Sequence, residues 1–239
     1  MKDLKKEEKI LEDPSQIYRP DVPDYEEKTK DFRNYGEDNA LFDRVKKTYL
    51  DMHTNQTVEY VNRMHQKYLT FEREMRISDV FEKLEKFVDI SDPDITLPNY
   101  FHGIQTAEGI RKDNHPEWLQ LVGLIHDIGK IMYQWGCDQD GTSLNEQWGI
   151  VGDTFIVGCQ LPKKIVYPEY NNVNKDKDNP KYNTLLGIYS KNCGLENVKC
   201  SWGHDEYLYQ VLKHNKCKLP EQALYIIRYH SLYSYHTNK

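Results

Sequence analysis

The sequence predicts an all-α fold, on two observations. Apolar residues recur at helical spacing in successive segments, and no part of residues 136–200 shows the alternation of apolar and polar residues typical of a half-buried strand. The chain has 239 residues, of which 38% are hydrophobic, so it is long enough to bury one large core. We expect a single helical domain over residues 32–239.

A charged arm precedes this domain over residues 1–31. The arm carries Pro14, Pro20 and Pro23 and has few apolar side chains, so it cannot build a core of its own. We expect it to be partly disordered.

The first helical segment covers residues 37–71, where apolar side chains recur every three or four positions. This spacing predicts either one long helix or two consecutive helices. The pattern repeats over residues 77–88, and the Ser, Asp and Pro residues of segment 91–94 then predict a turn.

Two of the helices that follow carry candidate ligands in the middle of the chain. One is predicted over residues 99–112, with His102 near its start, and the other over residues 116–134, with His126 and Asp127 in its later half.

Two later helices carry one histidine each. They begin near Gly203 and at Pro220, and their apolar stripes include His204 and His230. Both imidazoles are therefore expected to point into the core.

Composition argues against several classes of protein. A formal net charge of -6 provides no basic field for nucleic acid, and no run approaches the roughly 20 apolar residues that span a bilayer. The N-terminus lacks the apolar core of a signal peptide. The five cysteines are odd in number and form no C-x-x-C pair, which argues against disulfides and a thiolate zinc site. We expect a soluble, monomeric, cytoplasmic protein that binds neither nucleic acid nor membrane.

The adjacent pair His126 and Asp127 lies in the apolar run 122–130. A carboxylate in such a run is costly to bury as a free ion, so it requires a counter-charge, hydrogen bonds or a metal. One histidine in an apolar setting is usually a hydrogen-bonded core residue, but this chain has four. Imidazole and carboxylate ligands suit iron, manganese, zinc or nickel.

The spacing of the pair predicts a dinuclear centre. Neighbouring side chains of an α-helix diverge by about 100°, so His126 would bind one metal while Asp127 bridges two. His102 would complete the ligands of one metal, and His204 and His230 would serve the other.

Lys130 follows His126 by one helical turn. Spacing alone favours a solvated lysine that stabilises the C-terminal end of a helix dipole. The alternative is an ammonium beside the metals that holds a substrate hydroxyl or stabilises an oxyanion. Asp205 and Glu206 are interpreted as supporting or surface acids rather than ligands.

Longer strings are more specific than the order of the histidines. They include Leu-Ile-His-Asp-Ile-Gly-Lys-Ile-Met at 124–132 and Ser-Trp-Gly-His-Asp-Glu-Tyr-Leu-Tyr-Gln at 201–210, and others lie at 101–112, 151–155 and 193–198. Together with the four histidines, these strings resemble the myo-inositol oxygenase family of the HD-domain superfamily. The likeness covers roughly residues 30–237.

The resemblance implies an HD-type helical bundle around two iron ions in a mixed-valence Fe2+/Fe3+ state. Such a centre uses dioxygen to cleave the ring of myo-inositol in a four-electron oxidation, giving D-glucuronate. By position, His102, His126 and Asp127 would bind the first iron, and Asp127, His204 and His230 the second. Lys130 and Asp127 would be the catalytic residues.

The resemblance also implies a set of substrate contacts that offer donors and acceptors to an uncharged hexol. They are Arg33, Asp89, Ile90, Ser91, Lys130, Gly152, Asp153, His230 and Ser231.

One departure from the family pattern concerns the end of the chain. Family members continue beyond the segment that matches residues 236 and 237, and that continuation supplies a second aspartate ligand and another lysine. We therefore expect the domain to be C-terminally incomplete and its activity to be impaired. A smaller departure is Ile90, where the family tends to have an acid.

Two other functions remain as alternatives. The chain would be a non-catalytic truncated homologue, or an HD-type metal-dependent phosphohydrolase. The second needs basic residues around the metals, for which Lys130, Arg111 and Arg228 are the candidates.

Overall fold

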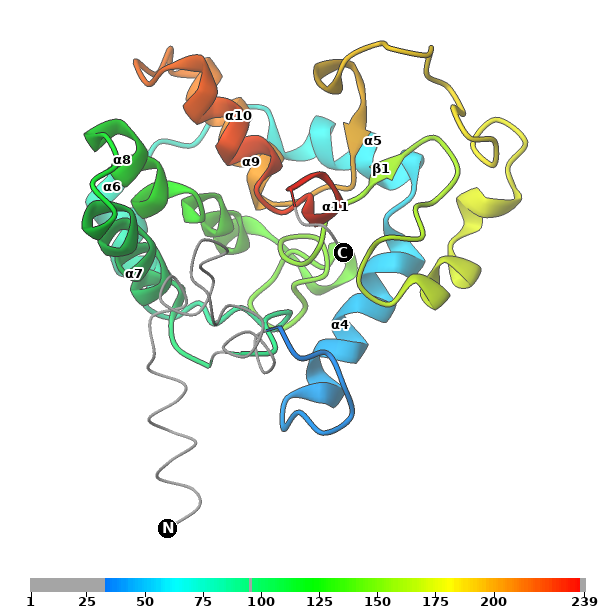
Figure 1. Cartoon of the computed structure of the whole chain (residues 1–239), viewed down its shortest axis with the longest axis horizontal. Helices are drawn as coiled ribbons and strands as arrows, with labels where there is room; N and C mark the ends of the chain where they lie inside the picture. Colours follow the sequence, from blue (N-terminus) through cyan, green and yellow to red (C-terminus); the bar gives the residue numbers. More distant parts are fainter. Residues whose placement is uncertain (1–32, 95, 237–239) are drawn as a thin grey trace.

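The computed structural model describes residues 33–94 and 96–236, and it is helical, as predicted (Figure 1). The predicted arm at 1–31 lies outside the described residues, and the division into arm and single domain stays a prediction. The α-helices of the described part are α4 Phe42–Asn55, α5 Val58–Tyr68, α6 Ile77–Leu84, α7 Asn99–Lys112, α8 Glu117–Ile125, α9 His204–His214, α10 Glu221–Tyr229 and α11 Tyr233–His236.

The segment 37–71 forms two consecutive helices, α4 and α5. Gln56 separates them, and its buried amide donates to the carbonyl of Trp202 at 2.7 Å. Thr57 then caps α5 by accepting a hydrogen bond from the Tyr60 amide at 3.2 Å. The Gln56 side chain, which lies between α4 and α5, thus joins these helices to the segment that precedes α9.

The prediction of one helix over residues 116–134 is wrong. α8 ends at Ile125, and a 3-10 helix, η1, runs over Ile128–Trp135. Packing explains the change of winding, because η1 lies directly against the start of α9. A Cβ built on Gly129 would lie 2.1 Å from the carbonyl oxygen of His204.

Short 3-10 turns and two strands are spread along the connection from η1 to α9. They are η2 Asp138–Asp140, β1 Ile156–Val157, η3 Pro168–Val173, η4 Lys175–Asp178, η5 Leu195–Asn197 and β2 Lys199–Cys200. The expectation of no strand in this region is corrected only by the antiparallel pair β1 and β2, in which Ile156 faces Cys200. Two residues per strand are too few to produce a period-2 pattern.

The helices pack in pairs around one hydrophobic core. α7 packs against α8, and α9 packs against both α10 and η1. In Figure 1, α6, α7 and α8 stand together on one side, while α4 lies on the other. No helix of the described part is both long and apolar enough to cross a bilayer.

Candidate metal centre

The five predicted ligands come from separate segments and lie at or near helix ends. His102 is in the first turn of α7, His126 directly follows α8, and Asp127 precedes η1. His204 is the first residue of α9, and His230 directly follows α10. Helix packing, rather than one helix face, brings the side chains together.

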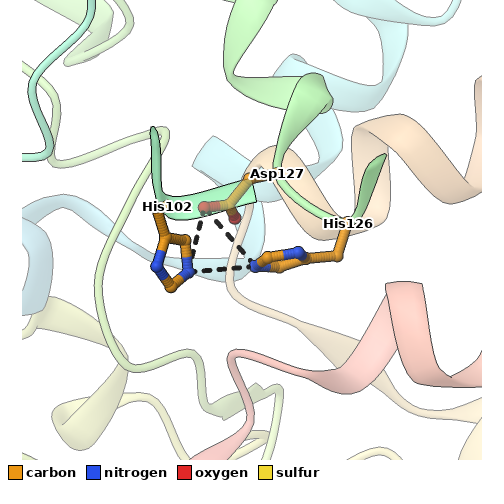
Figure 2. Close-up of side chains that lie close together, drawn as sticks. All are labelled: His102, His126 and Asp127. Atoms are coloured by element: carbon orange, nitrogen blue, oxygen red, sulfur yellow. Dashed lines mark hydrogen bonds and ion pairs between the residues drawn. The ribbon is translucent and has the colours of Figure 1, made fainter. Parts of the chain in front are cut away.

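The carboxylate of Asp127 lies at the centre of this cluster. Its Oδ2 is 3.7 Å from Nε2 of His102 and 3.5 Å from Nε2 of His126, and Figure 2 shows the carboxylate between the two rings. Its Oδ1 is 2.9 Å from Nε2 of His204 and 3.4 Å from Nε2 of His230. Each oxygen therefore faces one pair of imidazoles, which is the geometry of a bridging carboxylate.

Within each pair, the two Nε2 atoms are close together. They lie 3.2 Å apart in His102 and His126, and 2.9 Å apart in His204 and His230. Two ligands at right angles around one ion, with bonds of about 2.1 Å, are about 3 Å apart. Both pairs thus have the spacing of ligands that share an ion.

The opposite ring nitrogens determine the tautomers. Nδ1 of His126 and of His230 donates to the carbonyl three residues earlier, at 2.7 Å in each case, and Nδ1 of His204 donates to the Ile150 carbonyl at 2.6 Å. Because a carbonyl only accepts, these rings carry their proton on Nδ1 and present a lone pair at Nε2. In the pair His204 and His230, two such lone pairs face each other and repel unless a cation lies between them, and His126 turns its lone pair toward His102, so the donor set fits two metal ions.

Electrostatics keep the ligands in the protonation states that bind metals. Burial lowers the pKa of His126 to about 3 and also lowers the pKa of His102, so both rings are neutral. Burial by itself would raise the pKa of Asp127, but the ammonium of Lys130 and the contacts of His204 and His230 hold this pKa well below its ordinary value. Asp127 is therefore an anion available to a metal.

Lys130 is not the solvated helix-end lysine that its spacing favours. Its side chain is buried, and Nζ donates to Asp127 Oδ2 at 2.9 Å, to Asp89 Oδ2 at 2.8 Å and to Asn99 Oδ1 at 2.7 Å. The 3-10 winding after Asp127 turns Lys130 toward that carboxylate. Burial would lower the pKa of Lys130, but the carboxylates of Asp127 and Asp89 raise it above its ordinary value.

A cavity of about 310 Å³ opens beside the centre. Seven of the nine predicted substrate contacts line it, namely Arg33, Asp89, Ser91, Lys130, Gly152, His230 and Ser231.

Two predicted contacts, Ile90 and Asp153, are not among the residues that line the cavity. The Ile90 amide donates to Gln147 at 3.2 Å, and Asp153 accepts from the Val166 amide at 3.0 Å and the Tyr233 amide at 3.2 Å. Asp153 thus supports the cavity wall, and the substrate contacts of these two residues stay predictions.

Comparison with known proteins is consistent with this geometry. A protein-family model described as myo-inositol oxygenase matches residues 42–239. The chain belongs to the myo-inositol oxygenase family. It is 50% identical to the inositol oxygenase of Mus musculus over 230 residues, which cover 94% of this chain and 77% of the mouse protein. It is 46% identical to the Homo sapiens inositol oxygenase, with 95% and 78% coverage, and 45% identical to inositol oxygenase 1 of Arabidopsis thaliana, with 87% and 66% coverage.

Some cavity residues of this myo-inositol oxygenase family member were missed by sequence reasoning. Asn99, Asp92, Tyr35 and Tyr233 also line the cavity. Asn99 begins a predicted helix, and Asp92 lies in a segment that predicted only a turn, so neither pattern pointed to a ligand. The signal available was the density of polar residues at the turn between α6 and α7.

The two acids after His204 are buried rather than on the surface. Glu206 accepts from Arg228 Nε at 2.6 Å, and Asp205 Oδ1 accepts from the Glu206 amide at 2.8 Å. Neither belongs to a group of potential ligands among the described residues. Their interpretation as supporting acids agrees with these contacts, and the surface alternative is wrong.

Proposed function

We propose that this protein is an oxygenase that converts myo-inositol and dioxygen to D-glucuronate at two iron ions in a mixed-valence Fe2+/Fe3+ state. One oxygen atom enters the product and the other leaves as water, which balances the four-electron oxidation. The observation that carries the proposal is the pair of three-residue clusters that share Asp127 beside a cavity with polar side chains on its wall. The family membership and the inositol oxygenase relatives support the substrate.

The proposed ligands follow the two clusters. His102, His126 and Asp127 would hold one iron, and Asp127, His204 and His230 the other. When bound, the irons would supply a Lewis acid for a pair of substrate hydroxyls and a route by which electrons from the substrate reach dioxygen.

Lys130 is proposed to hold a substrate hydroxyl next to the centre. Its ammonium is already oriented by Asp89, Asp127 and Asn99, so a hydroxyl oxygen placed in the cavity would meet a fixed donor. Asp89 is oriented in turn, because its Oδ1 accepts from both the amide and the hydroxyl of Ser91, at 2.9 and 2.7 Å. The polar wall thus binds through hydrogen bonds rather than through net charge.

The basic residues near the centre are paired with carboxylates, which argues against a phosphohydrolase. Lys130 already faces two carboxylates, and Arg228 is paired with Glu206 at 2.6 Å. Arg111 is paired with the exposed Glu108. The three basic residues that would have held a phosphate are therefore engaged with acids, whereas an uncharged polyol needs no excess positive charge.

We also propose a cellular compartment, an oligomeric state and the class of partners. All five cysteines are free, as is usual in a reducing compartment, and we assign the protein to the cytoplasm as a monomer. Its substrates are small molecules, and we assign it neither a nucleic acid nor a membrane partner.

The test is to purify the protein without oxygen in the presence of ferrous iron and cysteine, count iron per chain and then assay glucuronate after adding myo-inositol and oxygen. We expect two irons and product, and Lys130→Met should keep the iron but lose most turnover. Two irons without product would favour the non-catalytic alternative. Hydrolysis of a phosphate ester without oxygen would favour the phosphohydrolase.

A further inference from the structure

The turn between α6 and α7 places three aspartates on the cavity wall, and they are used differently. Asp89 binds Lys130 and Ser91, and both oxygens of Asp94 accept from the Arg33 amide at 2.9 and 2.8 Å. Within the described ranges 33–94 and 96–236, Asp92 accepts one hydrogen bond, from the Asp94 amide to Oδ1 at 2.7 Å. Among the described residues, Oδ2 of Asp92 has no hydrogen-bond or ion-pair partner.

Hydrogen bonds from other segments fix the backbone of this turn, and the Asp92 side chain lines the cavity. Arg44 donates to the carbonyl oxygen of Asp92 at 3.0 Å, and Asn39 donates to the carbonyl of Pro93 at 2.9 Å. Ser91 and Pro93 are buried, whereas Asp92 keeps partial exposure. Since Asp92 also lines the cavity, its second oxygen is available to a ligand there.

A cyclic polyol requires acceptors of this kind. Each ring hydroxyl that enters the cavity loses hydrogen bonds to water, and an unreplaced bond costs affinity. The oxygens of Asp89 and Asp127 already accept from Lys130, so they are partly occupied. Asp92 Oδ2 is a carboxylate oxygen on the same wall that has no donor in the described part of the chain.

The charges around Asp92 favour a hydrogen bond from a substrate hydroxyl to its carboxylate. Burial and the neighbouring carboxylates of Asp89 and Asp94 raise the pKa of Asp92 to about 7, and Lys130 opposes this rise only in part. The guanidinium groups of Arg33 and Arg44 act on Asp92 from the other elements that pack here, without forming an ion pair with it. A hydroxyl donor would therefore stabilise the ionised carboxylate.

We propose that Asp92 is a substrate-binding residue, which holds a ring hydroxyl through Oδ2. This inference rests on the proposed polyol substrate. Asp92 would thus contribute to the affinity for the substrate, although it is neither a ligand of the metals nor a hydrogen-bond partner of Lys130.

Asp92→Asn tests Oδ2 alone, because the amide keeps an oxygen for the Asp94 N–H and replaces the free acceptor with a donor. At pH 8, where Asp92 is largely ionised, we expect KM for myo-inositol to rise about fivefold or more with kcat changed less than about twofold. The anaerobic dissociation constant of myo-inositol, measured by calorimetry on the iron-loaded protein, should rise by the same factor. The matched control is Asp178→Asn, at a carboxylate whose side chain is 76% exposed.

Monodeoxy-inositols identify the contact independently of folding. One analogue should bind the wild type less tightly than myo-inositol does but bind wild type and Asp92→Asn equally, because it lacks the hydroxyl that Asp92 holds. A KM and a dissociation constant within about twofold of the wild type would overturn the assignment of Asp92 while leaving the proposed function intact. A wild type that neither binds nor converts myo-inositol would overturn both.

Discussion

Nζ of Lys130 lies 2.9 Å from Oδ2 of Asp127, and both side chains are 5% exposed. The carboxylate that is shared by two groups of histidines therefore has a counter-charge of its own. This pairing explains how an anion can be buried in an apolar run before any metal binds. It also places the ammonium on the cavity side of the centre, where a substrate would meet it.

Asp127→Ala should abolish binding at both metal positions, because this carboxylate belongs to both clusters. Iron analysis of protein prepared without oxygen should give less than about one iron per chain. His102→Ala is the matched control, since His102 belongs to one cluster, and it should keep the iron held by His204 and His230. Two irons in Asp127→Ala would contradict the bridge.

Lys130→Met should destabilise the metal-free protein by about 3 kcal/mol, since it leaves Asp89 and Asp127 buried without their ammonium. Urea unfolding measures the change. Adding Asp89→Asn to the variant should recover part of the loss. Lys177→Met breaks an exposed ion pair with Asp178 and should change stability by less than about 0.5 kcal/mol. Equal effects of the two lysine substitutions would refute the role given to burial.

Gly129→Ala should destabilise the protein by about 2 kcal/mol or more, because the new Cβ would lie 2.1 Å from the His204 carbonyl oxygen. Relief of this clash would separate η1 from α9, so His204 should move away from Asp127 and iron binding should weaken. Thermal unfolding and iron content are the measurements. Gln134→Ala, at an exposed position of the same 3-10 helix, should leave both unchanged.

Asp92 should make the metal-free protein less stable as pH rises from 5 to 8. Its pKa is about 7 in the folded protein and has its ordinary lower value when unfolded, so the native state binds more protons within this window. The amide of Asp92→Asn does not titrate, so the unfolding free energy of this variant relative to the wild type should increase by about 2–3 kcal/mol between pH 5 and pH 8. A difference that is independent of pH would show that Asp92 does not titrate in this range.

The sequence was sufficient for most of the helices and for naming the candidate ligands. Helical spacing predicted the segments that became α4 to α7, and Asn99–Lys112 has the predicted bounds. The ligands were detectable because imidazoles and a carboxylate in apolar runs need partners whatever the fold. The family strings added the cavity residues that no periodicity indicates, such as Arg33 and Gly152.

The remaining features depend on contacts between segments distant in the chain. The end of α8 at Ile125 and the 3-10 winding of η1 follow from close packing on α9, about 75 residues later, which no local propensity encodes. The same packing turned Lys130 inward, although its spacing favoured solvent. The roles of Asn99 and Asp92 were also undetectable, because a polar residue at a helix start or turn is usually explained by the turn itself.

For this protein, the sequence by itself determined the helical class and the chemistry of the candidate centre, because periodicity and the cost of burying a charge act locally. Only the tertiary structure decided which oxygen of Asp127 faces which pair of histidines. It also decided that Lys130 neutralises this carboxylate, whereas one oxygen of Asp92 has no donor among the residues that the structure describes. Those relationships depend on how helix ends from separate segments meet, and distances of about 3 Å are set by packing rather than by spacing along the chain.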